Sequence, residues 1–338
     1  MDQSFERYSR QLLFPGIGEE GQLRLSKARI LIVGVGALGT VLANHLVRAG
    51  VGFVRLADRD YVESSNLQRQ MLFDEADVEA SLPKAIAAKK RLETINSSIE
   101  IEAIVTDVNQ DNIEQLIEGV DLVLDGTDNF STRFLLNDSC FKHQIPFVYG
   151  GAVSSRGMSA LFIPNETPCL RCFIDHGDTQ GQTCDTIGVI SPVVDIVASY
   201  QSVEAIKYLV GATDKLRGSL KTFDIWHNQQ YELKMKDSKA NCPVCHHQEY
   251  PALTKDFDEV VSLCGRETIQ IKRKEKLDLK AWAETLKKVA DVTETPFLLR
   301  ATLDEGEKLV LFPDGRVLIQ GTDDMVRAKT LFSRYIGN

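Results

Sequence analysis

The chain has 338 residues, of which 43% are hydrophobic and 26% are charged. That length predicts two domains, and the composition excludes a mainly disordered, collagen-like or coiled-coil chain. The formal net charge of −9 argues against a general nucleic-acid or anionic-membrane binder, because such proteins need a basic surface. No apolar run reaches the roughly 20 residues that cross a bilayer, and the first residues lack a secretory-signal pattern. We therefore expect a cytoplasmic protein with no membrane or nucleic-acid partner.

The first predicted unit of structure is a strand, a glycine-rich turn and a helix. Residues 29–33 are a short apolar run typical of a buried parallel strand. The sequence Gly34-Val-Gly-Ala-Leu-Gly39 follows at once, and helical apolar spacing comes after it. A second strand, 53–57, ends on Asp58, which lies 19 residues after the last glycine. This order is typical of a nucleotide-binding βαβ unit.

Strands and helices continue to alternate along the first half of the chain. We expect helices at 83–95, 111–118 and 130–143, and strands at 99–105, 121–125 and 146–149. Farther along, the patterns predict strands at 159–164 and 221–226 and a long helix at 192–210. Alternation of this kind predicts an α/β fold with a Rossmann-like, doubly wound, mainly parallel sheet. We assign it to a first domain, residues 1–250.

The last part of the chain reads as a separate small α+β domain, residues 257–338. Residues 237–256 are polar and contain two prolines, so we expect a linker there. After it we expect a strand near 263–272, an amphipathic helix at 278–290, strands at 296–303, 308–312 and 316–320, and a helix at about 323–335. The sequence Pro313-Asp-Gly315 is a hairpin-turn signal between two of these strands.

Four of the seven cysteines form two C-x-x-C pairs, Cys169 with Cys172 and Cys242 with Cys245. In a reducing compartment two such pairs favour a tetrahedral zinc site with four thiolate ligands over disulfides. Such a site has no open position, so its role is structural. The alternative is a redox motif or an accidental pair. His246 and His247 follow the second pair and are substitute ligands in a weaker alternative.

The glycine-rich turn has a physical role in nucleotide binding. Gly34 permits the tight turn, Gly36 lets a phosphate approach the backbone, and Gly39 lets the helix pack on the strand. The helix N-terminus then presents free N–H groups and the positive end of its dipole. Asp58 would accept hydrogen bonds from ribose hydroxyl groups. Taken alone, this pattern indicates a nucleotide and makes NAD the default ligand.

The residues after Asp58 favour ATP. Arg69 lies in the polar stretch 65–70, Lys84 begins the next helix, and Asp128 follows a strand end. An enzyme that cleaves ATP needs cations against the triphosphate and a carboxylate for Mg²⁺, whereas an NAD-dependent oxidoreductase does not. Ligands of α/β proteins bind where strands end, so these three residues are expected to share one site.

Seven motifs in order resemble the E1-like adenylyltransferases of the ThiF/MoeB/HesA group over about residues 5–250. They are RYSRQ at 7–11, GVGALG at 34–39, DRD at 58–60, SNLQRQ at 65–70, PK at 83–84, TDN at 127–129 and the two C-x-x-C pairs. The resemblance implies an enzyme that uses ATP to adenylate the C-terminal Gly-Gly carboxylate of a ubiquitin-like sulfur carrier, ThiS or MoaD. The product leads to a thiocarboxylate for thiamine thiazole or molybdopterin biosynthesis, with sulfur from a donor such as a cysteine desulfurase.

The resemblance also implies roles for individual residues. Gly34, Gly36 and Gly39 would contact the phosphates, Asp58 the ribose, and Asn66, Arg69, Gln70 and Lys84 the triphosphate, while Asp128 would bind Mg²⁺. Arg10 would reach the ATP site of the partner subunit in a homodimer. Cys169, Cys172, Cys242 and Cys245 would bind structural zinc.

Three points stay open in the sequence. Cys184 lies outside both pairs, and it is either a nucleophile that links covalently to the activated carrier or a small buried residue. Cys140 and Cys264 are expected in the core. The alternatives to a ThiS or MoaD adenylyltransferase are E1-like activation of another ubiquitin-like protein or a peptide, an NAD-dependent oxidoreductase, and a zinc-stabilised binding protein. The last domain is expected to serve carrier docking or dimer support.

Overall fold

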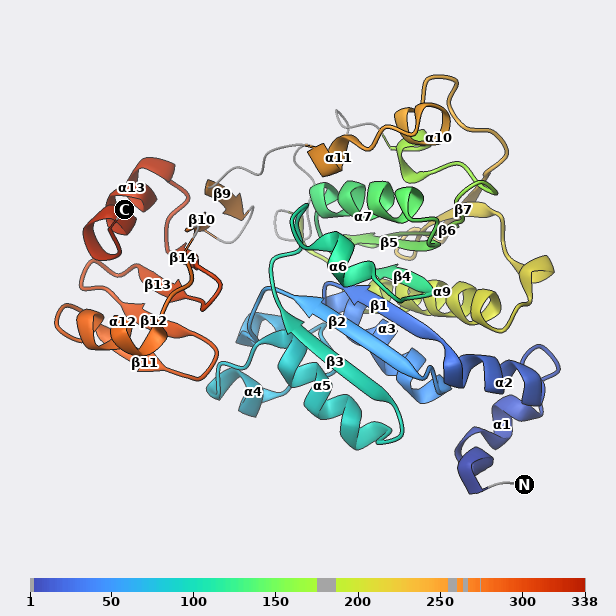
Figure 1. The fold of residues 1–338 in the computed structure, drawn as a ribbon, viewed down its shortest axis with the longest axis horizontal. Helices are drawn as coiled ribbons and strands as arrows, with labels where there is room; N and C mark the ends of the chain where they lie inside the picture. The colour runs from blue at the N-terminus through green and yellow to red at the C-terminus, as the bar shows by residue number, and fades with distance from the viewer. Residues whose placement is uncertain (1–2, 175–186, 255–259, 264–266, 274, 338) are drawn as a thin grey trace. The chain divides into compact units, whose positions relative to one another are not determined.

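The computed structural model describes residues 3–174, 187–254, 260–263, 267–273 and 275–337 (Figure 1). The chain divides into two compact units, Met1–Lys255 (unit 1) and Asp256–Asn338 (unit 2). Among the described residues, no helix combines the length and the apolar character that a membrane span requires.

Unit 1 is built on an eight-stranded sheet with the order β3-β2-β1-β4-β5-β6-β7-β8. The first five strands are parallel, and β6, β7 and β8 are added antiparallel at one edge. Their bounds are β1 (Arg29–Val33), β2 (Phe53–Asp58), β3 (Glu100–Val105), β4 (Leu122–Asp125), β5 (Phe147–Val153), β6 (Arg156–Phe162), β7 (Ser219–Asp224) and β8 (Gln229–Lys234). The expected mainly parallel sheet is confirmed.

Helices cover both faces of this sheet, as the doubly wound prediction requires. On one face lie α3 (Ala37–Ala49), α5 (Lys84–Ile95) and α9 (Ser191–Leu209), and on the other lie α6 (Ile113–Ile117) and α7 (Phe130–Lys142). Alternate residues of β1 divide between the two cores, because successive side chains of a strand point to opposite faces. Ile30 and Ile32 pack with the first group of helices, and Leu31 and Val33 pack with the second.

Shorter elements complete unit 1. They are η1 (Gln3–Tyr8), α1 (Ser9–Leu12), α2 (Gly18–Lys27), η2 (Ser64–Asn66), α4 (Glu75–Glu79), η3 (Leu170–Cys172), η5 (Thr213–Lys215), α10 (Pro243–His247) and α11 (Pro251–Thr254). The last two lie in the segment expected to be a linker, so that expectation is wrong for them. Strand β8 was also not expected, and all six of its residues are exposed.

Unit 2 has an antiparallel six-stranded sheet, β11-β12-β13-β14-β10-β9, packed on two helices. Its elements are β9 (Val260–Leu263), β10 (Thr268–Lys272), α12 (Leu279–Leu286), β11 (Asp291–Glu294), β12 (Leu299–Thr302), β13 (Lys308–Leu311), β14 (Arg316–Gln320) and α13 (Met325–Tyr335). The strand expected at 263–272 is confirmed only for β10, which pairs with the separate strand β9. Helix α12 ends at Leu286, before the expected end at 290, and strand β11 was not expected. The predicted hairpin joins β13 to β14, with Gly315 at φ +94°.

Candidate functional site

The glycine-rich loop follows β1, between the two neighbouring strands β2 and β4. Gly34 has φ +85°, and a Cβ on Gly39 would lie 1.9 Å from the carbonyl oxygen of Gly34. A Cβ on Gly126, in the loop after β4, would lie 2.2 Å from that same oxygen. The two loops are therefore in backbone contact, at the crevice where parallel α/β sheets bind their ligands.

The start of α3 is open toward this crevice. Gly36 is the N-cap of α3, and no side chain of the described residues caps the helix. Within the described part of the chain, a Cβ on Gly36 would have one neighbour within 4 Å, the Nε2 atom of Gln70 at 3.8 Å. The protein's own packing thus leaves space above Gly36, and the free N–H groups of the first helical turn favour an anion there.

Asp58 connects the end of β2 to the glycine-rich loop. Its Oδ2 accepts a hydrogen bond from the Val35 N–H at 2.6 Å, and its Oδ1 accepts one from the Asp60 N–H at 2.7 Å. Burial raises the pKa of the Asp58 carboxyl, and the nearby Lys84 opposes that shift. Each oxygen still has acceptor capacity for a hydroxyl group, since a carboxylate offers about four lone-pair sites.

Lys84 is the first residue of α5, and its side chain is almost fully buried. Its Nζ lies 3.4 Å from Oδ2 of Asp60, and its backbone N–H bonds to the Asp60 carbonyl at 2.9 Å. Since Asp60 follows Asp58 by two residues, the lysine is held beside the end of β2.

Asn66 and Gln70 belong to the polar stretch 65–70 and are both buried. Asn66 forms a reciprocal capping box with Glu63 around η2, and its carbonyl accepts the Gln70 N–H at 3.0 Å. The Oε1 atom of Gln70 is buried without a hydrogen-bond partner among the described residues, while its Nε2 faces Gly36. Arg69 is half-buried and donates to the Ser65 carbonyl at 2.9 Å.

The loop after β4 carries the exposed residue Asp128 and is fixed by a buried ion pair. Asp125 accepts hydrogen bonds from the Thr127 N–H and hydroxyl at 2.9 and 2.7 Å. The Nε of Arg133, on α7, lies 3.1 Å from the other oxygen of Asp125. Sequence reasoning missed this pair, because only the tertiary structure brings the strand end and the helix together.

Arg10 lies away from this cluster within its own chain. Next to it, Gln11 donates to the carbonyl of Ala49, the last residue of α3, at 3.0 Å. The 13 residues of α3 span about 18 Å at 1.5 Å per residue, so this contact is at the opposite end from the glycine-rich loop. Arg7 likewise donates to Ile95, the last residue of α5. Cys184, like Cys264, lies outside the described residues.

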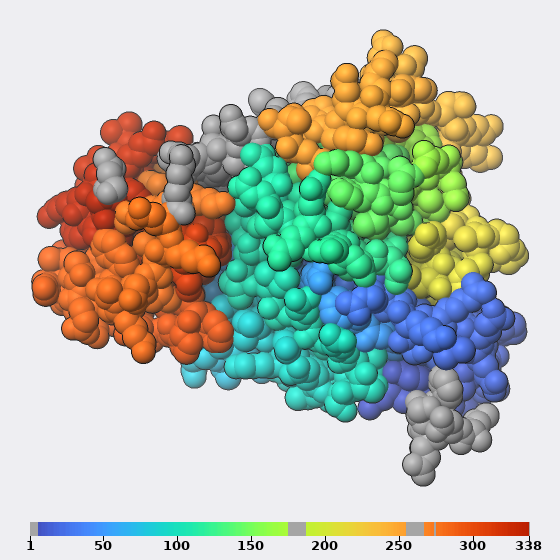
Figure 2. Space-filling view, viewed as in Figure 1, coloured from blue at the N-terminus to red at the C-terminus, as the bar shows by residue number. Residues whose placement is uncertain are grey.

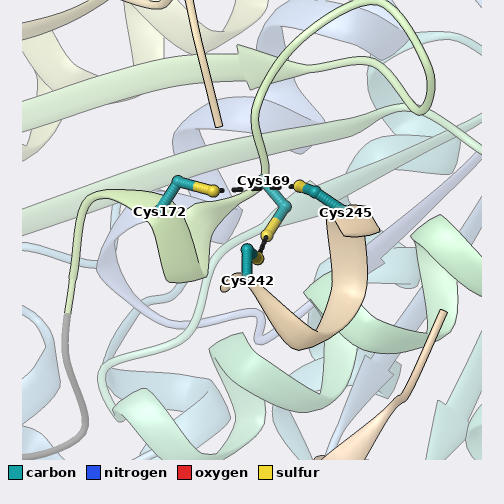
Figure 3. A group of neighbouring side chains, drawn as sticks. All are labelled: Cys169, Cys172, Cys242 and Cys245. Atoms are coloured by element: carbon teal, nitrogen blue, oxygen red, sulfur yellow. Dashed lines mark hydrogen bonds between the residues drawn. The ribbon is translucent and has the colours of Figure 1, made fainter. Parts of the chain in front are cut away.

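A second site consists of the four paired cysteines, which converge in a single cluster (Figure 3). All four sulfur atoms lie within 4.8 Å of one another. The Sγ atoms of Cys169 and Cys242 are 3.5 Å apart, and those of Cys172 and Cys245 are 3.8 Å apart. Zinc–sulfur bonds of about 2.3 Å in a tetrahedron give sulfur separations of about 3.8 Å. The donor set therefore fits a zinc ion.

The thiols of the cluster shift the pKa values of one another through hydrogen bonds. Hydrogen bonds from Cys169 and Cys245 lower the pKa of Cys172 to about 2, and the hydrogen bond to Cys172 raises the pKa of Cys169. The two histidines do not join the cluster: both are exposed, and His246 pairs with the Ser238 hydroxyl at 2.7 Å. Cys140 is buried in α7, as expected, and burial raises its pKa.

Helix α7 holds the segments that flank the cysteine cluster. Arg171, inside the first cysteine pair, makes two buried hydrogen bonds of 2.7 Å to Asp138 on α7. Asn137 accepts the Leu170 N–H at 2.8 Å, and Asp138 also accepts the Ala252 N–H of α11 at 2.9 Å. The first cysteine pair and α11, which follows the second pair, are thus both anchored on one helix, and the orange segment lies beside the green one at the surface (Figure 2).

Comparison with known proteins identifies the family. The model of the ThiF family matches residues 8–244. The chain belongs to the ThiF family. This confirms the resemblance that the motifs indicated. This ThiF protein is 45% identical over 336 residues to the sulfur carrier protein ThiS adenylyltransferase of Bacillus subtilis (strain 168), a match that covers 98% of this chain and 99% of that one.

A further relative and a solved structure each match about 70% of the chain. The sulfur carrier protein ThiS adenylyltransferase of Escherichia coli (strain K12) is 37% identical over 245 residues, which are 72% of this chain but 96% of that relative. The relative is therefore too short to contain a counterpart of both units. Among solved structures, E. coli MccB with ATP aligns with a TM-score of 0.63 and 25% identity, over 71% of this chain and 74% of MccB. This likeness agrees with the predicted E1-like fold.

Proposed function

We propose that this ThiF protein uses ATP to adenylate the C-terminal Gly-Gly carboxylate of a ubiquitin-like sulfur carrier of the ThiS type. The observation that carries the proposal is the contact between the glycine-rich loop and the loop bearing Asp128, with Asp58, Gln70 and Lys84 around it. The full-length similarity to a ThiS adenylyltransferase supports ThiS over MoaD as the carrier. The activated carrier then receives sulfur from a donor such as a cysteine desulfurase and becomes a thiocarboxylate.

Different residues of the site bind different parts of ATP. Gly34, Gly36 and Gly39 leave backbone space and N–H groups for the phosphates, and Asp58 accepts hydrogen bonds from the ribose. Asn66, Arg69, Gln70 and Lys84 surround the triphosphate. The Asp128 carboxylate is the candidate ligand for Mg²⁺, since this cation prefers oxygen ligands and pairs one or two carboxylates with substrate phosphates. When bound, the metal neutralises charge on the phosphates.

The reaction that this arrangement supports needs little covalent chemistry from the protein. The carrier carboxylate is ionised at neutral pH, so no general base is required. It attacks the α-phosphorus of ATP, a bond forms between the carboxylate oxygen and that phosphorus, and the α–β bond breaks to release pyrophosphate. Catalysis then consists of positioning and of charge neutralisation by the buried Lys84 and by Arg69.

We propose a structural role for the cysteine cluster, with zinc as the metal. Four thiolates close the coordination sphere and leave no position for a substrate. The cluster joins residues that lie 73 positions apart in the sequence. The segments that flank the cluster contact α7 and α11. A metal bound there would therefore cross-link distant parts of unit 1.

We also propose a homodimer in which Arg10 serves the site of the partner subunit. Arg10 lies near the far end of α3 from its own glycine-rich loop, so it cannot act in cis. Helix α9 packs against the core through Val193, Val194 and Val197, yet two of its apolar residues, Ile196 and Val203, are 36% and 49% exposed. This exposed side of α9 is the surface that we assign to a second copy.

Mixing two inactive variants tests the dimer. We expect Arg10→Ala and Asp128→Asn homodimers each to lose exchange activity, whereas mixed dimers contain one complete site. Random reassortment should restore about a quarter of the wild-type activity, because half of the dimers are mixed and each has one of two sites intact. Carrier-dependent ATP–pyrophosphate exchange after subunit mixing measures this. A mixture that stays inactive, although mass spectrometry shows mixed dimers, would place Arg10 outside the site.

Carrier-dependent ATP–pyrophosphate exchange also tests the proposed activity. We expect exchange with a ThiS-type carrier and none with the same carrier lacking its last two glycines, which controls for exchange that does not depend on the Gly-Gly terminus. A MoaD-type carrier is assayed beside it. Exchange with MoaD alone would change the pathway to molybdopterin, and no exchange with either carrier would refute the proposal.

A further inference from the structure

The ion pair between Asp125 and Arg133 is buried directly beneath the loop that carries Asp128. The two side chains are 0% and 7% exposed. The guanidinium of Arg133 contacts three separate parts of the chain: its Nε faces Asp125 at 3.1 Å, and one Nη donates to the carbonyls of Thr127 at 2.7 Å and Gly150 at 3.1 Å. It thereby joins the end of β4, the following loop and strand β5.

The residues on both sides of Asp128 are held in this way. Before it, Thr127 is bound through its N–H, its hydroxyl and its carbonyl, by Asp125 and Arg133 together. After it, Asn129 caps α7 by accepting the Thr132 N–H at 2.8 Å. The Asp128 backbone is therefore fixed at both neighbours, although its side chain is exposed.

We propose that Arg133 is a positioning residue that aims the Asp128 carboxylate at the metal–nucleotide site beside the glycine-rich loop. This inference rests on the proposed function. A planar guanidinium can reach three acceptors in fixed directions, whereas an ammonium group is a point charge on a flexible stem. The geometry of Arg133, and not its charge alone, is what the loop requires.

A second buried ion pair provides a matched control at the other end of α7. Arg171 and Asp138 are 7% and 0% exposed, the same values as for Arg133 and Asp125. Arg171 contacts Asp138 in the helix but supports the cysteine pair rather than the Asp128 loop. Lysine at either position removes guanidinium hydrogen bonds at a similarly buried site. Comparing the two variants therefore separates a general loss of stability from a specific misplacement of the Asp128 carboxylate.

The experiment measures metal binding directly. Mn²⁺ is titrated into the full-length protein holding α,β-methylene-ATP, and free Mn²⁺ is followed by electron paramagnetic resonance. We expect Arg133→Lys to weaken Mn²⁺ binding by about 10–100-fold, the usual effect of removing a partner that orients a metal-binding side chain. Nucleotide affinity without metal should stay unchanged, and Arg171→Lys should bind Mn²⁺ as the wild type does. Thr127→Val, a milder change that removes one hydrogen bond to Asp125, should shift binding in the same direction and tests the idea if Arg133→Lys does not fold.

Two results would overturn the inference: wild-type Mn²⁺ affinity in both Arg133→Lys and Thr127→Val, or an equal loss in Arg171→Lys. Because the titration needs no carrier, it is independent of the proposed substrate. A wild-type protein that binds Mn²⁺ with the ATP analogue but exchanges pyrophosphate with no carrier refutes the function alone.

Discussion

Asp128→Asn is expected to reduce carrier-dependent ATP–pyrophosphate exchange by about 10²–10³-fold, the usual effect of removing one preorganised electrostatic group from an active site. Asparagine keeps the size of the side chain but removes the negative charge that a hard divalent cation requires. The side chain is exposed at the end of β4, so its loss should change the free energy of unfolding little. Exchange kinetics and the thermal midpoint, measured on the same preparation, separate the two effects.

A charge-matched control accompanies this variant. Asp214 is an exposed aspartate of η5 that pairs with Lys215 at 2.9 Å, and Asp214→Asn removes the same charge from a surface with no part in the site. We expect it to exchange pyrophosphate at the wild-type rate. If Asp128→Asn also keeps that rate, Asp128 is not the metal ligand, and the loop after β4 is not part of the metal site.

The largest expected effect on stability comes from the cysteine cluster. Cys242→Ser should release the metal and lower the thermal midpoint by about 10 °C or more, because a structural zinc site contributes its binding free energy to folding. The loss leaves three thiols packed together without a cation, and it frees η3 from α10. Metal content by atomic absorption and calorimetry on the same sample measure both consequences.

Cys140→Ala is the matched control for this variant. Cys140 is fully buried in α7 and lies outside the cluster, so its removal deletes one sulfur atom from the core and should leave one zinc per chain. The structural role of zinc is contradicted if Cys242→Ser retains full metal content, or if it loses the metal with an unchanged midpoint. Strong chelators should reproduce the effect of Cys242→Ser in the wild-type protein.

Local patterns in the sequence were enough to predict the nucleotide-binding half of the fold. The strand at 29–33, the glycine-rich turn and the helix after it are adjacent in the chain, so their geometry depends on short-range sterics and on apolar periodicity. The cysteine pairs were predictable for a similar reason, since each pair occupies one tight turn. The hairpin at Gly315 also follows from a local signal.

Features that depend on contacts between distant residues were not accessible in this way. Strand β8 is exposed along its whole length and is held only by its pairing with β7, and β9 and β10 are two paired strands where the pattern predicts one. The support of the Asp128 loop by Arg133 depends on the pairing of β4 with β5, which brings the Gly150 carbonyl within reach of the guanidinium. The remote place of Arg10 depends on the contact of Gln11 with the far end of α3. The residue types that can bind phosphate, metal and zinc are visible in the amino-acid sequence alone. Which of them meet in one chain depends on the fold, because only folding brings the ends of separate strands to one edge of the sheet.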